Sequence, residues 1–290
     1  MEAKPVPDKR RLPHWWYYLL FPALTVQGFF VRRVLGLIWG NIFVVYGLIP
    51  LLDQMIKQDW QNPTLEEIMK IEKQNRYRFC LYIVIFLEWL LFFVSVVKQT
   101  EVTVWTIAPM LFIRANMYAS GFLVAHELFH KENHLDKFVG TVHMIKSCYM
   151  HFMVEHIYGH HKNVSTPLDP ASAPKDMNVY KFIPHSVKGG YLSAYKINPR
   201  FVTLSTIASL MLILGIWKFV GIQAMLMHIV SVVGGVSYLE AINYVEHYGL
   251  RRKQLSNGSY EKVTIRHSWN SAHTISNFFF FKLQRHSDHH

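Results

Sequence analysis

Histidines dominate the chemistry that this sequence could perform. All but one of its 17 histidines follow residue 125, and most of them fall into short clusters. Two histidines four residues apart share a helical face, with β-carbons about 5–6 Å apart, so both imidazoles can bind one metal ion. A further histidine directly after such a pair points elsewhere and can reach a second ion. Imidazole suits iron, copper, nickel and zinc.

Three clusters and one histidine at the end of an apolar block supply nine candidate ligands, which are too many for one ion and suit two. They are His126, His130, His156, His160, His161, His247, His286, His289 and His290. Neutral ligands leave such a centre strongly cationic, so nearby acids should orient and balance it. The candidates for this role are Glu127, Asp169, Glu246 and Asp288, together with Glu240 on a helical face that leads to His247.

Two other interpretations of the histidines are weaker. Surface histidines near lipid headgroups would explain one pair, but they do not explain three clusters just outside apolar blocks. The segment His126–Glu127–Leu128–Phe129–His130 also matches the zinc protease pattern of two ligands and a general base. That interpretation leaves the second and third clusters without a role.

The elements that position these residues are membrane helices. Hydrophobic residues make up 51% of the 290 residues and come in long blocks. Spanning the hydrocarbon takes about 20 apolar residues. Six candidate spans follow: 17–31, 34–52, 79–97, 102–125, 201–220 and 222–241. The apolar segment 138–154 contains His143, Lys146 and His151, so we expect it to lie beneath the bundle or to be re-entrant.

The charge distribution favours lipid over nucleic acid as a partner. The net charge is +11, and the basic residues lie at the ends of apolar blocks, where they would meet anionic headgroups. An even number of spans places the N-terminus and the histidine clusters on one side, and the excess of Lys and Arg there predicts the cytoplasmic or an equivalent organelle-interior side. Arg32 and Arg33 are exceptions. Two cysteines cannot form a disulfide framework.

The predicted fold is an all-α integral membrane protein with six transmembrane helices and a histidine-rich di-metal domain on the cytoplasmic-type face. We divide the chain into a polar N-terminal segment (1–16), helices 1 to 4 (17–125), a histidine-box region (126–200), helices 5 and 6 (201–241) and a C-terminal histidine-box segment (242–290). The first segment lacks the features of a cleaved signal or transit peptide.

Two charged residues fall in the middle of neighbouring spans, Glu88 and Arg114. A lone charge at that depth is costly, so we predict a structural ion pair between them. The functional alternative is a path for protons or substrate.

The motifs resemble those of the integral-membrane alkane hydroxylases (alkane 1-monooxygenases), within the fatty acid desaturase and hydroxylase superfamily. The resemblance covers nearly the whole chain. It rests on segments 126–131, 155–161, 166–172, 243–250, 267–270 and 283–290, and upstream on 49–53 and 62–63. The segments Asn243-Tyr-Val-Glu-His-Tyr-Gly249 and Gln284-Arg-His-Ser-Asp-His-His290 favour this family over ordinary desaturases.

The resemblance implies a non-haem centre of two iron ions held by the same nine histidines, and terminal hydroxylation of an alkane or lipid-like chain with O2. Electrons would come from a separate rubredoxin- or ferredoxin-like protein. Val45 stands where relatives can carry a bulky residue that limits chain depth in the substrate channel. A fatty acid desaturase or hydroxylase is the nearest chemical alternative.

Three departures from the family pattern bear on function. Phe129 replaces a usual glycine, the segment 185–200 is shorter, and the chain ends at His290 where relatives continue. The last departure motivates an alternative of a different class, a catalytically silent subunit of a larger membrane complex that retains the di-iron fold. The presence of all nine ligands argues against it.

Overall fold

The computed structural model describes residues 14–33, 36, 39–60, 65–72, 74–97 and 104–288. Helices make up the regular structure of these residues, together with one isolated bridge between Gln254 and Tyr260, and the predicted all-α class is confirmed. The α-helices are α1 Leu20–Arg33, α2 Gly40–Phe43, α3 Ile49–Met55, α4 Leu65–Glu72, α5 Asn75–Val97, α6 Val104–Phe129, α7 His134–His143, α8 Phe152–Val154, α9 His161–Asn163, α10 Val179–Ile197, α11 Pro199–Phe219, α12 Ile222–His247 and α13 Thr274–Phe279.

Shorter turns of other helix types interrupt this order. The 3-10 segments are η1 Trp15–Leu19, η3 Met144–Ser147, η5 Ile265–His267 and η6 His286–Asp288. The two π-helical segments are η2 Val44–Leu48 and η4 Glu155–His160. Single π-helical turns are rare and are frequent at functional sites. Here η2 carries Val45, and η4 carries His156 and His160.

Four of the described helices are long and apolar enough to cross a bilayer. They are α5 with 23 residues, α6 with 25 in its apolar part, α11 with 21 and α12 with 26. At about 1.5 Å per residue, each exceeds the roughly 30 Å of hydrocarbon. The chain is therefore a multi-pass membrane protein.

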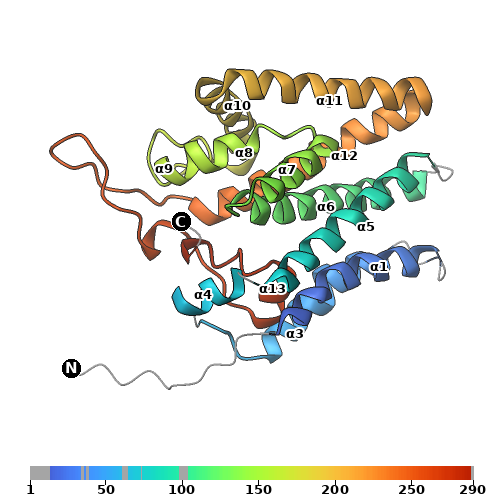
Figure 1. Ribbon diagram of the computed structural model, residues 1–290, viewed down its shortest axis with the longest axis horizontal. Coiled ribbons are helices and arrows are strands. Elements are labelled where there is room, and N and C mark those ends of the chain that lie inside the picture. The colour runs from blue at the N-terminus through green and yellow to red at the C-terminus, as the bar shows by residue number, and fades with distance from the viewer. Residues whose placement is uncertain are drawn as a thin grey trace.

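The first two predicted spans are less regular. Helix α1 has 14 residues, and the apolar stretch Gly40–Met55 is also shorter than a full span. In Figure 1, α1 and α3 lie together beside α5. The count of six spans stays a prediction.

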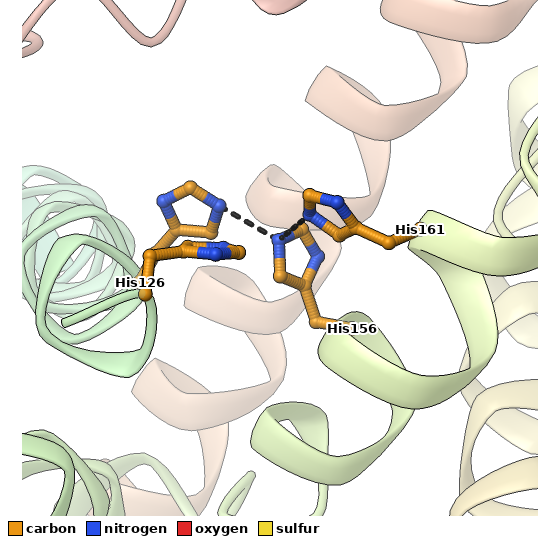
Figure 2. Close-up of side chains that lie close together, drawn as sticks. His126, His156 and His161 are labelled. Carbon is orange, nitrogen blue, oxygen red and sulfur yellow. Dashed lines mark hydrogen bonds between the residues drawn. The ribbon is translucent and has the colours of Figure 1, made fainter. Parts of the chain in front are cut away.

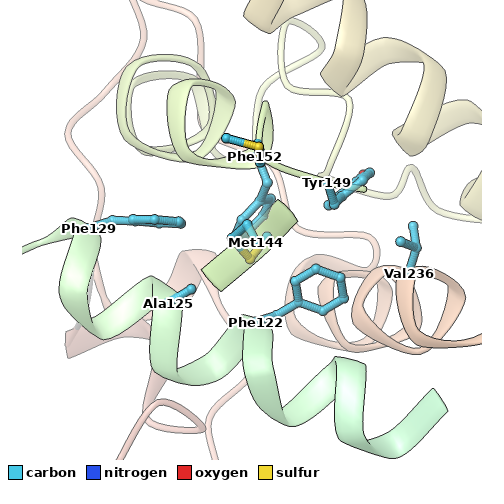
Figure 3. Close-up of a cluster of buried hydrophobic side chains, with 8 residues drawn as sticks. Phe122, Ala125, Phe129, Met144, Tyr149, Phe152 and Val236 are labelled. Atoms are coloured by element: carbon cyan, nitrogen blue, oxygen red, sulfur yellow. The ribbon is translucent and has the colours of Figure 1, made fainter. Parts of the chain in front are cut away.

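The centre of the molecule is the contact between α6 and α12, where small residues let the backbones approach. A β-carbon on Gly235 would lie 2.5 Å from Cβ of Tyr118, so this position excludes larger side chains. Such small-residue contacts are typical of helix packing in membranes. Toward the histidine-bearing end, Phe122, Phe129, Met144 and Phe152 form a buried apolar cluster (Figure 3).

Phe129 is accommodated in this cluster and is 1% exposed. Gly140 of α7 supplies the room, because a β-carbon there would lie 3.1 Å from Cε1 of Phe129. The departure from the family glycine is thus matched by a glycine on the neighbouring helix.

Segment 138–154 forms no single helix long enough to cross a bilayer, in line with the prediction that it lies beneath the bundle or is re-entrant. Helix α7 has 10 residues and gives way to η3. Cys148 then adopts a left-handed conformation with φ of 53°, which turns the chain before α8. The resulting fold carries α4, α9 and α13 at one end of the long helices (left in Figure 1).

Candidate metal centre

The first histidine group joins the end of α6 to η4 and α9. His126 lies in the last turn of α6, and His130 directly follows the helix. His126 Nε2 lies 2.7 Å from His156 Nε2, which lies 3.0 Å from His161 Nε2. Figure 2 shows these three rings facing one another. With His130, each residue offers a ligand atom within 4.8 Å of the others.

The second group consists of His160, His247 and His286, all of them buried. They come from η4, the end of α12 and η6, so three distant parts of the chain meet here. The Nε2 atoms of His247 and His286 are 3.0 Å apart. The adjacent residues His160 and His161 belong to different groups, as the spacing argument expected.

The geometry of these rings fits metal ions. Two nitrogens that each lie about 2.1 Å from one ion, at a right angle, are about 3.0 Å apart. Outer hydrogen bonds also fix the ring nitrogens: His160 Nδ1 donates to Asp169 Oδ2 at 2.9 Å, and His247 Nδ1 donates to the His267 carbonyl at 3.1 Å. The Nε2 lone pairs of both rings are then available for a metal.

The predicted acidic neighbours differ in how closely they approach the histidines. Asp169 is held by Ser172 Oγ at 2.5 Å and by the backbone N–H of Ala171, so its contact with His160 is rigid. Glu246 Oε1 is 3.4 Å from His286 Nδ1, and Glu127 Oε1 is 3.9 Å from His126 Nδ1.

Glu240 instead accepts hydrogen bonds from Tyr149 at 2.8 Å and from Asn243 at 3.3 Å. It therefore supports the packing of α12 against the segment before α8. The side chain of Asp288 and both His289 and His290 lie outside the described residues.

An apolar cavity of about 430 Å³ opens beside both histidine groups. His126 and His156 of the first group line it, and so does His286 of the second. Most of the remaining wall comes from apolar side chains of α1, α5, α6, α12 and the α2–α3 stretch. Val45 also lines the cavity, and its role in a substrate channel stays a prediction.

Comparison with known proteins identifies the family to which this chain is similar. The model of the fatty acid desaturase family matches residues 102–290. Alkane 1-monooxygenase 2 of Pseudomonas aeruginosa is 36% identical over 272 residues, which cover 87% of this chain and 72% of that protein. Alkane 1-monooxygenase of Pseudomonas putida is 30% identical, covering 98% of this chain and 75% of the relative.

The chain belongs to the fatty acid desaturase family, in the branch of the alkane 1-monooxygenases.

A more distant relative lies outside that branch. The xylene/toluene monooxygenase hydroxylase component XylM of Pseudomonas putida is 25% identical over 181 residues, covering 58% of this chain and 48% of that protein. Membership of this family of oxidoreductases leaves the zinc protease interpretation without support. It also agrees with the use of a metal by the histidine groups.

The predicted ion pair between Glu88 and Arg114 is wrong, because the cation that pairs with Glu88 is a different residue. Glu88 contacts Lys146 Nζ, His143 Nε2 at 3.1 Å and Ser120 Oγ at 2.8 Å. The physical reason is that α7 and η3 fold back beneath the long helices and bring a lysine to the carboxylate. Arg114 donates to the carbonyl of Ser95 and lines the cavity.

Sequence reasoning assigned no role to two buried acids near the site. Glu155 is 5% exposed, and burial together with the nearby Asp169 carboxylate raises its pKa. Asp53 accepts the N–H of Ile275 at 2.7 Å and the hydroxyl of Ser276 at 2.6 Å, which anchors the start of α13. The family-like segment Ile49-Pro-Leu-Leu-Asp53 was a signal for this residue, but its partner could not be found from spacing.

Proposed function

We propose that the chain is a membrane non-haem di-iron monooxygenase that hydroxylates alkanes or similar apolar chains with O2. The names of its relatives support the reaction, and the family supports the use of a metal. The observation that carries the proposal is the cavity, because its apolar wall ends at histidines of both groups. A chain lying in this cavity would present its end to the metals.

The nine histidines would hold the two ions. His126, His130, His156 and His161 form one site, and His160, His247 and His286 form the other. His289 and His290 complete the set by the resemblance of their motif. Iron bound there would supply the oxidising power that an unactivated C–H bond requires.

The remaining residues position ligands and exclude water. Asp169 fixes the ring of His160, Glu246 faces His286, and Glu127 lies beside His126. Asp288 and Glu240 are proposed to act around the second site from further out. The apolar wall, including Val45, keeps water from the chain and limits its depth.

Two electrons must enter from outside, because the two cysteines of this chain cannot bind an iron–sulfur cluster alone. We infer a separate rubredoxin- or ferredoxin-like donor that docks on the polar face near the histidines. That face and the N-terminus are proposed to lie on the cytoplasmic-type side, with six spans and the five-part division of the chain given above.

The test is turnover under labelled oxygen. The iron-loaded protein in detergent, with a rubredoxin or ferredoxin and its reductase, should convert dodecane to an alcohol that carries one atom of 18O from 18O2. His156→Ala should abolish the product. Bound iron with no product from the wild type would contradict the proposal and favour the silent subunit. A desaturated product would favour the desaturase alternative.

A further inference from the structure

A basic hairpin, residues 251–266, extends from the end of the molecule that carries the histidines. Gln254 and Tyr260 form an isolated antiparallel bridge in it, and the N–H of Glu261 donates to the Lys253 carbonyl at 3.0 Å. In Figure 1 this loop projects to the left, beyond the ends of the long helices. It contains five cations and one acid, which gives it a formal charge of +4.

The positive charge of the basic hairpin faces outward. Four of its cations are exposed: Arg251, Lys253, Lys262 and Arg266. The acid Glu261 is instead engaged within the fold, because its Oε1 accepts the N–H of Lys253 at 2.8 Å and lies 3.4 Å from His267 Nε2. A cluster of like charges on a projecting loop attracts an oppositely charged partner and raises the rate of encounter.

The base of the basic hairpin is hydrogen-bonded next to both histidine groups. Arg252 Nη1 donates to the Lys162 carbonyl at 3.1 Å, and Lys162 directly follows His161. At the other end of the hairpin, the carbonyl of His267 accepts the hydrogen bond of His247 Nδ1 at 3.1 Å. A single hydrogen bond therefore joins the main chain that leaves the hairpin to a candidate ligand of the second group.

An exposed tryptophan follows the basic hairpin and contacts both sequence neighbours of His247. Trp269 is 58% exposed. Its indole Nε1 donates to the Tyr248 carbonyl at 3.1 Å, and its backbone N–H donates to the Glu246 carbonyl at 2.8 Å. Tryptophan and arginine are enriched in protein interfaces and among the residues that dominate their binding energy. Anionic lipid headgroups would explain the cations alone, whereas a protein partner also explains an exposed ring this close to a candidate ligand.

We propose that the basic hairpin and Trp269 form the docking surface for the electron donor, a small protein that presents an acidic face around its redox centre. This inference rests on the proposed hydroxylase function and assigns the surface at which its partner binds. Each docked donor is oxidised by one electron, so two donor molecules are consumed for each alcohol formed. These two electrons and two protons balance the reduction of the second oxygen atom of O2 to water. Electron-transfer complexes typically have small interfaces, which suits one projecting loop and one ring.

The first experiment measures binding of an oxidised acidic rubredoxin to the iron-loaded protein in detergent, without reductant. The test variant replaces three exposed cations of the hairpin together: Lys253→Gln, Lys262→Gln and Arg266→Gln. The control variant removes the same charge from exposed positions of α10: Lys181→Gln, Lys188→Gln and Lys196→Gln. We expect the test variant to weaken binding about tenfold at low salt and the control about twofold or less. The difference should shrink as salt is added, because salt screens exposed charges.

The second experiment tests the tryptophan in the same binding assay. Trp269→Ala should weaken binding about tenfold, also at high salt, because it removes an apolar contact rather than a charge. Trp269→Phe keeps an aromatic ring but loses the indole N–H, so it should bind nearly as well as the wild type. Trp105→Ala is the control, since Trp105 is 84% exposed near the start of α6, whereas His126 lies in the last turn of that helix. Equal losses in Trp269→Ala and Trp269→Phe would contradict a contact through the ring.

Turnover of dodecane with rubredoxin and its reductase separates this inference from the proposed function. The triple hairpin variant should raise the KM for rubredoxin by about the same factor as it weakens binding, with kcat kept at saturating rubredoxin. Equal binding by this variant and the wild type would overturn the inference. So would a loss of co-purifying anionic lipid with rubredoxin binding unchanged, which would make the hairpin a headgroup site. A wild type that binds rubredoxin through the hairpin but oxidises no alkane would reject the hydroxylase function and leave the docking surface in place.

Discussion

Val45 is proposed to limit how far a substrate chain enters the cavity. It lies in the π-helical turn η2 and lines the same cavity as His126, His156 and His286. Val45→Trp should shorten the preferred substrate, because the indole fills space that the far part of the chain occupies. We expect about a tenfold or greater loss of kcat/KM for the longest chains that the wild type accepts.

Product-length profiling over a series of chains measures this effect. Phe43→Trp is the control, since Phe43 is 68% exposed and is not part of the cavity wall. A profile of Val45→Trp that matches the wild type would reject the channel position of this residue.

Asp169 should matter for metal binding although it contacts no metal in the proposed site. Its carboxylate accepts a hydrogen bond from His160 Nδ1 and thereby orients Nε2. Loss of such an outer partner typically weakens metal affinity by about 10–100-fold. Asp169→Asn should therefore lose iron in a competition with a chelator, whereas Asp176→Asn at an exposed position should not. Equal iron retention by both variants would contradict the role of Asp169.

For single residues, the sequence predicted the grouping of the histidines better than the partners of the buried acids. The spacing of His160 and His161 is local, and helical geometry alone sends the two rings to different groups. The partner of Glu88 was not predictable in the same way. Lys146 reaches it because α7 and η3 fold back against α6, and that packing does not follow from residue spacing.

The start of α13 is hydrogen-bonded by Asp53, a residue far away in the chain. Asp53, at the end of α3, caps its first turn across 222 residues and is 4% exposed. Removing this charge leaves two backbone N–H groups with a weaker acceptor, which costs about 1–3 kcal/mol. Because α13 leads to His286, Asp53→Asn should lower both the free energy of unfolding and the iron content.

Urea unfolding in detergent, with iron measured in parallel, tests this prediction. Glu66→Gln serves as the control, because its ion pair with Lys70 lies on an exposed face of α4. A loss of stability without a loss of iron would show that α13 does not position His286.

The pair of Glu88 and Lys146 fixes η3 against α5. Both side chains are buried, at 1% and 2% exposure, so breaking the pair leaves an uncompensated charge. Lys146→Met should destabilise the protein by about 3–5 kcal/mol, and Glu88→Gln in the same chain should recover part of this loss. Thermal unfolding in detergent compares the two variants. Additive losses in the double variant would contradict direct coupling.

Elements with a strong apolar pattern were predicted well. Helices α5, α11 and α12 follow from uninterrupted apolar blocks. The second candidate span contains a continuous helix over Gly40–Met55, shorter than a full span, and its π-helical turn η2 leaves no clear mark in hydrophobic spacing. Val45 lies in this turn, so the pattern does not show the irregular backbone that positions it.

For the whole molecule, an apolar cavity between the helices meets the two histidine groups. The family match covers α6 to the C-terminal segment, which contain all the candidate ligands. Residues of α1 and of the α2–α3 stretch contribute part of the cavity wall instead. Chemistry is therefore proposed for the second part of the chain, and selection of chain length for Val45 in the first.

The most direct test of this account is the iron content of the purified protein, measured by mass spectrometry and by Mössbauer spectroscopy of 57Fe-loaded samples. We predict two iron ions per chain, with each site lost separately in His156→Ala and His247→Ala. One ion per chain, or zinc as the sole tightly bound metal, would contradict the account.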